Sequence, residues 1–176
     1  MNHFRTSTLL CLSFAATSAF SQTLPGFSLK QAIGSAVWTE RSLAAKPTLV
    51  VLLSKGCPHN AKAAPHLSKL AKILSGKVRL IGVVNADQAD AAAYSKSIGL
   101  EFPVIADPKM TLISGMGGRH SLDFFSLAGK GARKASGMWE GYSRDWIAQA
   151  LKGIKVSFPP AKLEFLPAGR QSGCGF

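Results

Sequence analysis

The chain has 176 residues, 47% of them hydrophobic, and a formal net charge of +12 at pH 7. This length suits one domain with a sizeable core. The basic residues are scattered, form no run, and are interleaved with Ala and Gly rather than with aromatic residues. We therefore expect a solvated basic surface and no specific nucleic-acid partner.

The first 21 residues have the pattern of a secretory signal peptide. Met1 to Arg5 carry a positive charge, Thr8 to Phe20 are mostly apolar, and small residues precede a cleavage point near Ser21. The apolar part is too short for a permanent anchor, and no later stretch could cross a membrane. We expect an exported, periplasmic or extracellular protein, with a domain over 22–153 and a C-terminal tail over 154–176.

Cys57 stands where a predicted strand meets a predicted helix. Thr48 to Leu53 form an unbroken apolar run, typical of a strand buried on both faces. Ala61 to Leu74 place apolar residues at helical spacing. Pro58 suits the first helical position, and the amides and dipole of a helix start favour a thiolate at Cys57. The alternative is a buried, inert cysteine.

The remaining elements alternate in type, which predicts an α/β fold with a right-handed β–α–β crossover and a parallel strand pair.

Signal cleavage would leave Cys57 and Cys174, too few cysteines for a disulfide-stapled scaffold. We expect the tail to add an edge strand at Leu163 to Leu166 and then to fray. The other predicted strands are 78–84, 102–105, 122–127 and 132–138, and the other predicted helices are 88–98 and 143–152.

Several motifs in this order resemble the redoxin branch of the thioredoxin superfamily, which includes AhpC/TSA peroxiredoxins and exported thiol–disulfide oxidoreductases. Pro25-Gly26-Phe27-Ser28-Leu29 is similar to the opening P-x-F-x-L pattern of that branch, and Leu52 to Asn60 stand at its cysteine corner. Pro65 matches its helix-kinking proline, eight residues after Cys57. The resemblance covers roughly residues 25–152. It implies a thioredoxin fold, in which helices flank a central mixed β-sheet on both faces.

The sequence also departs from the family pattern. Asn60 replaces the second cysteine of C-x-x-C, so no vicinal disulfide can form at this corner. The family's cis-proline would fall near Arg119 to Leu122, where the chain has His120-Ser121. Ser54 matches the hydroxyl position of peroxiredoxins, and Arg119 matches their thiolate-stabilising arginine by rough position.

Together, the residues and the resemblance predict a thiol redox protein in which Cys57 attacks a disulfide or a peroxide and an external thiol restores it. The expected supporting residues are Ser54, Pro58, His59, Asn60 and Arg119. Cys174 could resolve an oxidised Cys57 within one chain or across a homodimer; otherwise it lies idle in a frayed tail. We expect no cofactor. We also expect no metal site at Cys57, His59 and His66, because no second cysteine or carboxylate stands at ligand spacing. The alternative function is a non-catalytic binding or structural module of the cell envelope.

Overall fold

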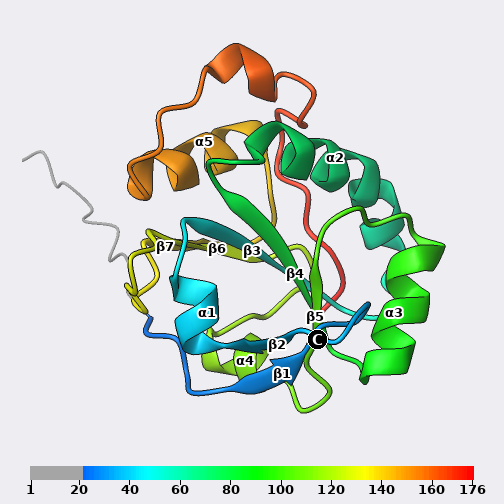
Figure 1. Ribbon diagram of the computed structural model, residues 1–176. Helices are drawn as coiled ribbons and strands as arrows, with labels where there is room; N and C mark the ends of the chain where they lie inside the picture. The colour runs from blue at the N-terminus through cyan, green and yellow to red at the C-terminus, as the bar shows by residue number, and fades with distance from the viewer. Residues whose placement is uncertain (1–21) are drawn as a thin grey trace, which may run out of the picture.

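The elements follow one another as β1-β2-α1-β3-α2-β4-α3-β5-α4-β6-β7-α5-η1 (Figure 1). The structure is a computed structural model and describes residues 22–176, so the predicted signal peptide lies outside the described residues. The strands are β1 (Ser28–Lys30), β2 (Val37–Thr39), β3 (Thr48–Leu53), β4 (Arg79–Val84), β5 (Val104–Ala106), β6 (Phe124–Leu127) and β7 (Gly137–Trp139). The helices are α1 (Glu40–Ala44), α2 (Pro58–Leu74), α3 (Gln88–Ser97), α4 (Thr111–Gly115), α5 (Arg144–Gly153) and the 3₁₀ helix η1 (Pro160–Leu163).

The central sheet is mixed and has the strand order β5-β4-β3-β6-β7. β3, β4 and β5 are parallel, whereas β6 pairs antiparallel with both β3 and β7. All six residues of β3 are buried, as expected for a central strand whose two faces are both covered. The predicted α/β class and mixed sheet are therefore confirmed.

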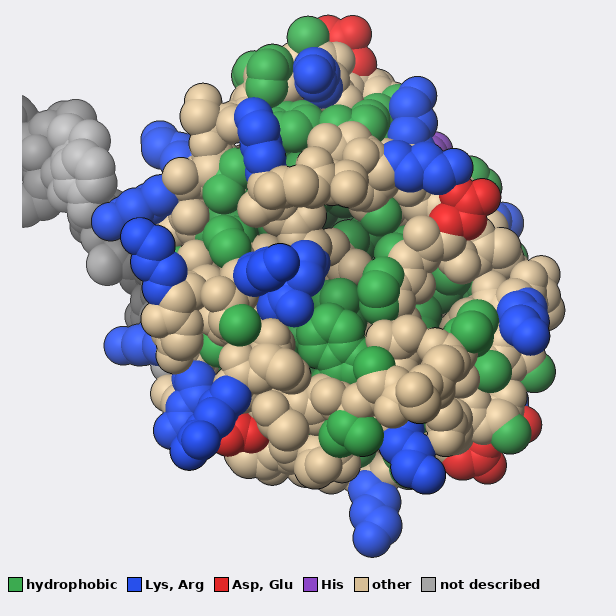
Figure 2. All heavy atoms as spheres, in the orientation of Figure 1, with side chains coloured by type: hydrophobic (Ala, Val, Ile, Leu, Met, Phe, Trp, Pro, Cys, Tyr) green, Lys and Arg blue, Asp and Glu red, His purple; other side chains and the backbone are tan. Residues whose placement is uncertain are grey.

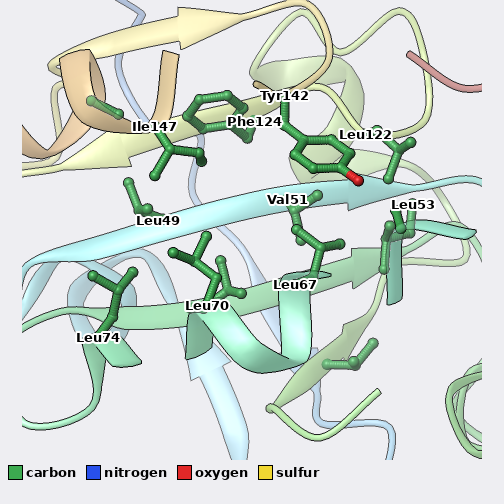
Figure 3. Packing of buried hydrophobic residues seen from close by; sticks show 14 of the residues in the cluster. Leu49, Val51, Leu53, Leu67, Leu70, Leu74, Leu122, Phe124, Tyr142 and Ile147 are labelled. Carbon is green, nitrogen blue, oxygen red and sulfur yellow. The ribbon is translucent and has the colours of Figure 1, made fainter. Parts of the chain in front are cut away.

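Two hydrophobic clusters lie on opposite faces of the sheet. On one face, Leu49, Val51 and Leu53 of β3 pack against α2 and α5 (Figure 3). On the other face, Val50 and Leu52 pack against residues of α1 and α4. The alternation of β3 side chains between the two faces places the carboxyl end of this strand, and the corner after it, between two packed layers.

The tail differs most from the sequence-based expectation. Residues 163–166 were expected to form an edge strand, but the chain forms a 3₁₀ helix at Pro160–Leu163 instead. The prolines at 159 and 160 fix φ and remove backbone donors, which suits a short helix start and opposes a ladder. The tail end is also not frayed: the segment coloured red in Figure 1 returns to the body and pairs with it.

The expected returning strand at 132–138 is also wrong in part. The strand that pairs with β6 is Gly137–Trp139, and the Ser136 N–H just before it donates to the Ser126 carbonyl at 2.8 Å. The preceding residues pair instead with the start of the described chain, where the Leu24 N–H donates to the Arg133 carbonyl at 2.8 Å. A competing partner from a distant part of the chain therefore shortened this strand.

Lys and Arg side chains are scattered over the face shown in Figure 2 and do not form one continuous patch. A hollow in the surface is lined by residues that include Trp38, Leu80 and Phe102.

Within residues 22–176, no helix combines the length and apolar character that a membrane span requires. The same part of the chain holds no group of three or more His, Cys, Asp and Glu side chains arranged for a metal ion.

Candidate active site at the Cys57–Cys174 pair

Cys57 is the N-cap residue of α2, at the corner that follows β3. Gly56 turns the chain with φ of +83°, a conformation that favours glycine. The Cys57 N–H donates to the Ser54 carbonyl at 3.1 Å, and Pro58 occupies the first turn of the helix. The predicted strand–corner–helix arrangement is thus confirmed, and it brings the helix start to the sulfur.

Cys57 is disulfide-bonded to Cys174, which is 117 residues further along the chain. The Cα atoms are 5.8 Å apart, within the usual range for a disulfide. The Cys174 N–H also donates to the Cys57 sulfur at 3.1 Å. The Cys57 side chain is largely buried, with 5% of its residue surface exposed. This disulfide therefore joins two segments that are far apart in the sequence.

The tail reaches Cys57 by pairing with residues 119–121, which we call the receiving edge. The Ser121 N–H donates to the Cys174 carbonyl at 2.7 Å, and the Gly173 N–H donates to the Ser121 carbonyl at 2.8 Å. The Phe176 N–H donates to the Arg119 carbonyl at 3.2 Å. These bonds set the antiparallel register of the tail and place Cys174 beside Cys57.

The receiving edge includes the residues where the sequence resemblance predicts the family's cis-proline. No cis peptide bond occurs within residues 22–176. The edge is held instead by the carboxylate of Asp123, which is 1% exposed and accepts hydrogen bonds from the N–H groups of Arg119, His120 and Gly141. Sequence reasoning missed Asp123; its charge at the start of an apolar strand was the available signal.

Asn60 occupies the place of the missing second cysteine and is 1% exposed. Its Oδ1 accepts a hydrogen bond from the Ser121 hydroxyl at 2.7 Å, and its Nδ2 donates to the Ser54 carbonyl at 3.0 Å. The Ser121 hydroxyl in turn accepts from the Ser54 N–H at 2.9 Å. This closed set of bonds ties the corner that carries Cys57 to the receiving edge.

Tyr94 of α3 completes this network and was also missed by sequence reasoning, because its place on the helix gives no local signal. Its hydroxyl accepts from the Asn60 Nδ2 at 2.9 Å and donates to the Cys57 carbonyl at 3.4 Å. Burial raises the pKa of Tyr94 above its usual value, against weaker opposing effects of hydrogen bonds from its neighbours. The hydroxyl therefore stays neutral at ordinary pH and can both donate and accept.

The other predicted supporting residues lie further from the disulfide chemistry. Pro58 and His59 are exposed at the start of α2. The side chain of Arg119 is 76% exposed and its guanidinium is 3.8 Å from Glu140, so this residue contributes to the receiving edge through its backbone. Lys55, which also stands at the corner, forms an ion pair with Asp90 of α3.

The fold and this cysteine site define a thioredoxin-like redoxin. The model of the AhpC/TSA family matches residues 20–135, which is more than half of the chain. The chain therefore belongs to the AhpC/TSA family, whose members are thiol-dependent oxidoreductases. No curated protein shows significant sequence similarity to the chain.

Solved structures of redoxins resemble this fold at low sequence identity. The peroxidoxin BcpB from Mycobacterium tuberculosis is 17% identical, with a TM-score of 0.61 over 77% of this chain and 95% of that chain. An exposed lipoprotein thioredoxin from Streptococcus pneumoniae is 19% identical, with a TM-score of 0.62 over 73% and 98% of the two chains. A secreted disulfide oxidoreductase from Mycobacterium tuberculosis is 17% identical, with a TM-score of 0.58 over 72% and 95%.

Proposed function

We propose that the protein is an exported thiol oxidoreductase in which Cys57 is the nucleophile and Cys174 is its resolving partner. The observation that carries this proposal is the disulfide between a cysteine at a helix N-terminus and a cysteine in a strand-paired tail. The helix start favours the thiolate, the form that reacts. Because the cross-link closes within one chain, the proposed cycle requires a single copy, and a homodimer is not needed for it.

With a disulfide substrate, the Cys57 thiolate attacks one sulfur and expels the other as a thiolate. The Cys174 thiolate then attacks the Cys57 sulfur of the mixed disulfide and releases the second substrate thiolate. The substrate gains two electrons, and the protein is left with the Cys57–Cys174 disulfide. An external dithiol reduces this bond by the same exchange and is itself oxidised.

Peroxide is the second candidate substrate, and membership of the AhpC/TSA family favours it. The Cys57 thiolate would attack one peroxide oxygen, forming a sulfenic acid and releasing an alkoxide, or hydroxide from hydrogen peroxide, which takes up a proton from the solvent. The Cys174 thiol would condense with the sulfenic acid, forming the disulfide and releasing water. The two substrates thus lead to the same oxidised protein.

Export would place the Cys57–Cys174 disulfide in an oxidising compartment, such as the periplasm or the extracellular space, where disulfides persist. The signal peptide that residues 1–21 predict, with cleavage near Ser21, would deliver the protein there. N-terminal sequencing of the protein recovered from the periplasm or the medium tests this step. A retained Met1 in cytoplasmic protein would contradict it.

Substitution of each cysteine tests the catalytic assignment. We expect Cys57→Ser to abolish both the reduction of insulin disulfides and the consumption of hydrogen peroxide in the presence of dithiothreitol. Cys174→Ser should still form a mixed disulfide or a sulfenic acid at Cys57, detectable by mass spectrometry, because the nucleophile is intact. If the wild type has neither activity, the alternative of a non-catalytic module in the cell envelope is favoured.

The reactivity of Cys57 should depend on pH as expected for a thiolate at a helix start. In the Cys174→Ser variant, the rate of alkylation by iodoacetamide is expected to reach half its maximum well below pH ~8.5, the value for free cysteine. The quantity to measure is the alkylation rate between acid and alkaline pH, with free cysteine as the reference. A midpoint equal to that of free cysteine would contradict an activating role for the start of α2.

A further inference from the structure

The tail positions Cys174 through the backbone of Ser121. Both the N–H and the carbonyl of Ser121 bond to the tail, on either side of the peptide unit that joins Gly173 and Cys174. Because strand side chains alternate with a period of two, a shift of one residue in this pairing would turn Cys174 away from Cys57. The position of Ser121 therefore decides whether the two sulfurs meet.

The side chain of Ser121 is anchored on the corner that carries Cys57. Its hydroxyl is fully buried, donates to Asn60 and accepts from the Ser54 N–H. The Ser54 carbonyl in turn accepts the N–H of Cys57. The side chain of Ser121 thus contacts the segment that carries Cys57, and its backbone contacts the segment that carries Cys174.

We propose that Asn60 and Ser121 are positioning residues for the Cys57–Cys174 couple: their hydrogen bond holds the receiving edge where the tail delivers Cys174 to the Cys57 sulfur. This inference rests on the proposed redox pair. Neither residue acts on a substrate. They hold the receiving edge in place before the tail pairs with it. The Cys174 thiol therefore has a high effective concentration beside Cys57.

The matched control for Ser121 is Ser68 of α2, which is also buried and makes two hydrogen bonds. Its hydroxyl donates to the Gly99 carbonyl at 3.2 Å and accepts from the Glu101 N–H at 3.2 Å. Ser121→Ala and Ser68→Ala therefore remove the same group with the same number of bonds. Only the first change disturbs the receiving edge, so the two variants separate a positioning effect from a general loss of stability.

The measurement is the equilibrium of the full-length protein with glutathione. One molecule of glutathione disulfide oxidises Cys57 and Cys174 to their disulfide and becomes two molecules of glutathione. We expect Ser121→Ala and Asn60→Ala each to lower this equilibrium constant about tenfold or more, the size of effect expected from a lost buried hydrogen bond. Ser68→Ala should leave it unchanged. Equal shifts for the Ser121 and Ser68 variants would overturn the proposal.

A substitution in the tail shows whether the network acts through the pairing. A Cβ at Gly173 would lie 2.7 Å from Ser121 Cβ and from its carbonyl oxygen, so we expect Gly173→Ala to displace the tail from the receiving edge without removing a buried group. At Gly175 the nearest atom would be 3.9 Å away, which makes Gly175→Ala the control. In the Gly173→Ala background, Ser121→Ala should lower the equilibrium constant with glutathione only a little further. If the two substitutions lower this constant by fully additive amounts, the proposal is contradicted.

Hydrogen exchange of the wild type provides a test that needs no variant. In the reduced protein, the amide of Ser54 should stay protected, because Ser121 still accepts its hydrogen bond, while the amides of Gly173 and Phe176 should lose protection. Loss of protection at Ser54 together with the tail would mean that the edge forms only around the tail, and would overturn the proposal. None of these measurements uses turnover, so they stand apart from a failure of the proposed enzymatic activity.

Discussion

Replacing Cys174 with serine is expected to lower the free energy of unfolding by about 4–5 kcal/mol under non-reducing conditions. The disulfide joins residues 117 positions apart, so it removes much of the conformational entropy of the unfolded chain. The measurement is urea denaturation of the oxidised wild type and of the variant, followed by tryptophan fluorescence. This loss is large beside the total stability of a typical domain, which is about 5–15 kcal/mol.

The same experiment with a reductant is the control. When dithiothreitol has opened the disulfide of the wild type, the two proteins should unfold at nearly the same urea concentration, because they then differ by a single tail side chain. A wild type that keeps its advantage after complete reduction would show that Cys174 stabilises the fold by packing. A variant as stable as the oxidised wild type would show that the disulfide does not constrain the unfolded chain.

Asp123→Ala is expected to destabilise the protein by about 3 kcal/mol or more. Its buried carboxylate accepts hydrogen bonds from three backbone N–H groups, and alanine would leave these donors without their partner. Two of the donors, those of Arg119 and His120, belong to the receiving edge. We therefore expect a second effect, a weaker disulfide between Cys57 and Cys174 in the equilibrium with glutathione.

Asp107 provides the matched control for this second effect. It too is a buried carboxylate that accepts three backbone N–H groups, those of Thr111, Leu112 and Ile113, at the start of α4. Asp107→Ala should lower the free energy of unfolding by a similar amount and leave the disulfide equilibrium as in the wild type. If both variants weaken the disulfide equally, Asp123 acts on stability alone and has no particular role at the receiving edge.

Residues that are close together in the sequence predict the elements around Cys57. The apolar run of β3, the turn at Gly56 and Pro58 at the helix start are local patterns that depend on neighbouring residues only. Local periodicity is enough to place a buried strand and an amphipathic helix, because burial selects side chains at spacings of two and of three to four residues. The fold class and the position of Cys57 were therefore predictable.

The way in which Cys174 reaches Cys57 depends on contacts between segments that are far apart in the sequence. The bond between Asn60 and Ser121 joins residues 61 positions apart, and the tail pairs with an edge that exists only when β6 lies beside β3. The buried carboxylate of Asp123 likewise accepts a hydrogen bond from another segment, the N–H of Gly141. Such contacts leave no periodic signal in the sequence. Their partners are chosen by packing and by the need to satisfy buried polar groups after the chain has folded.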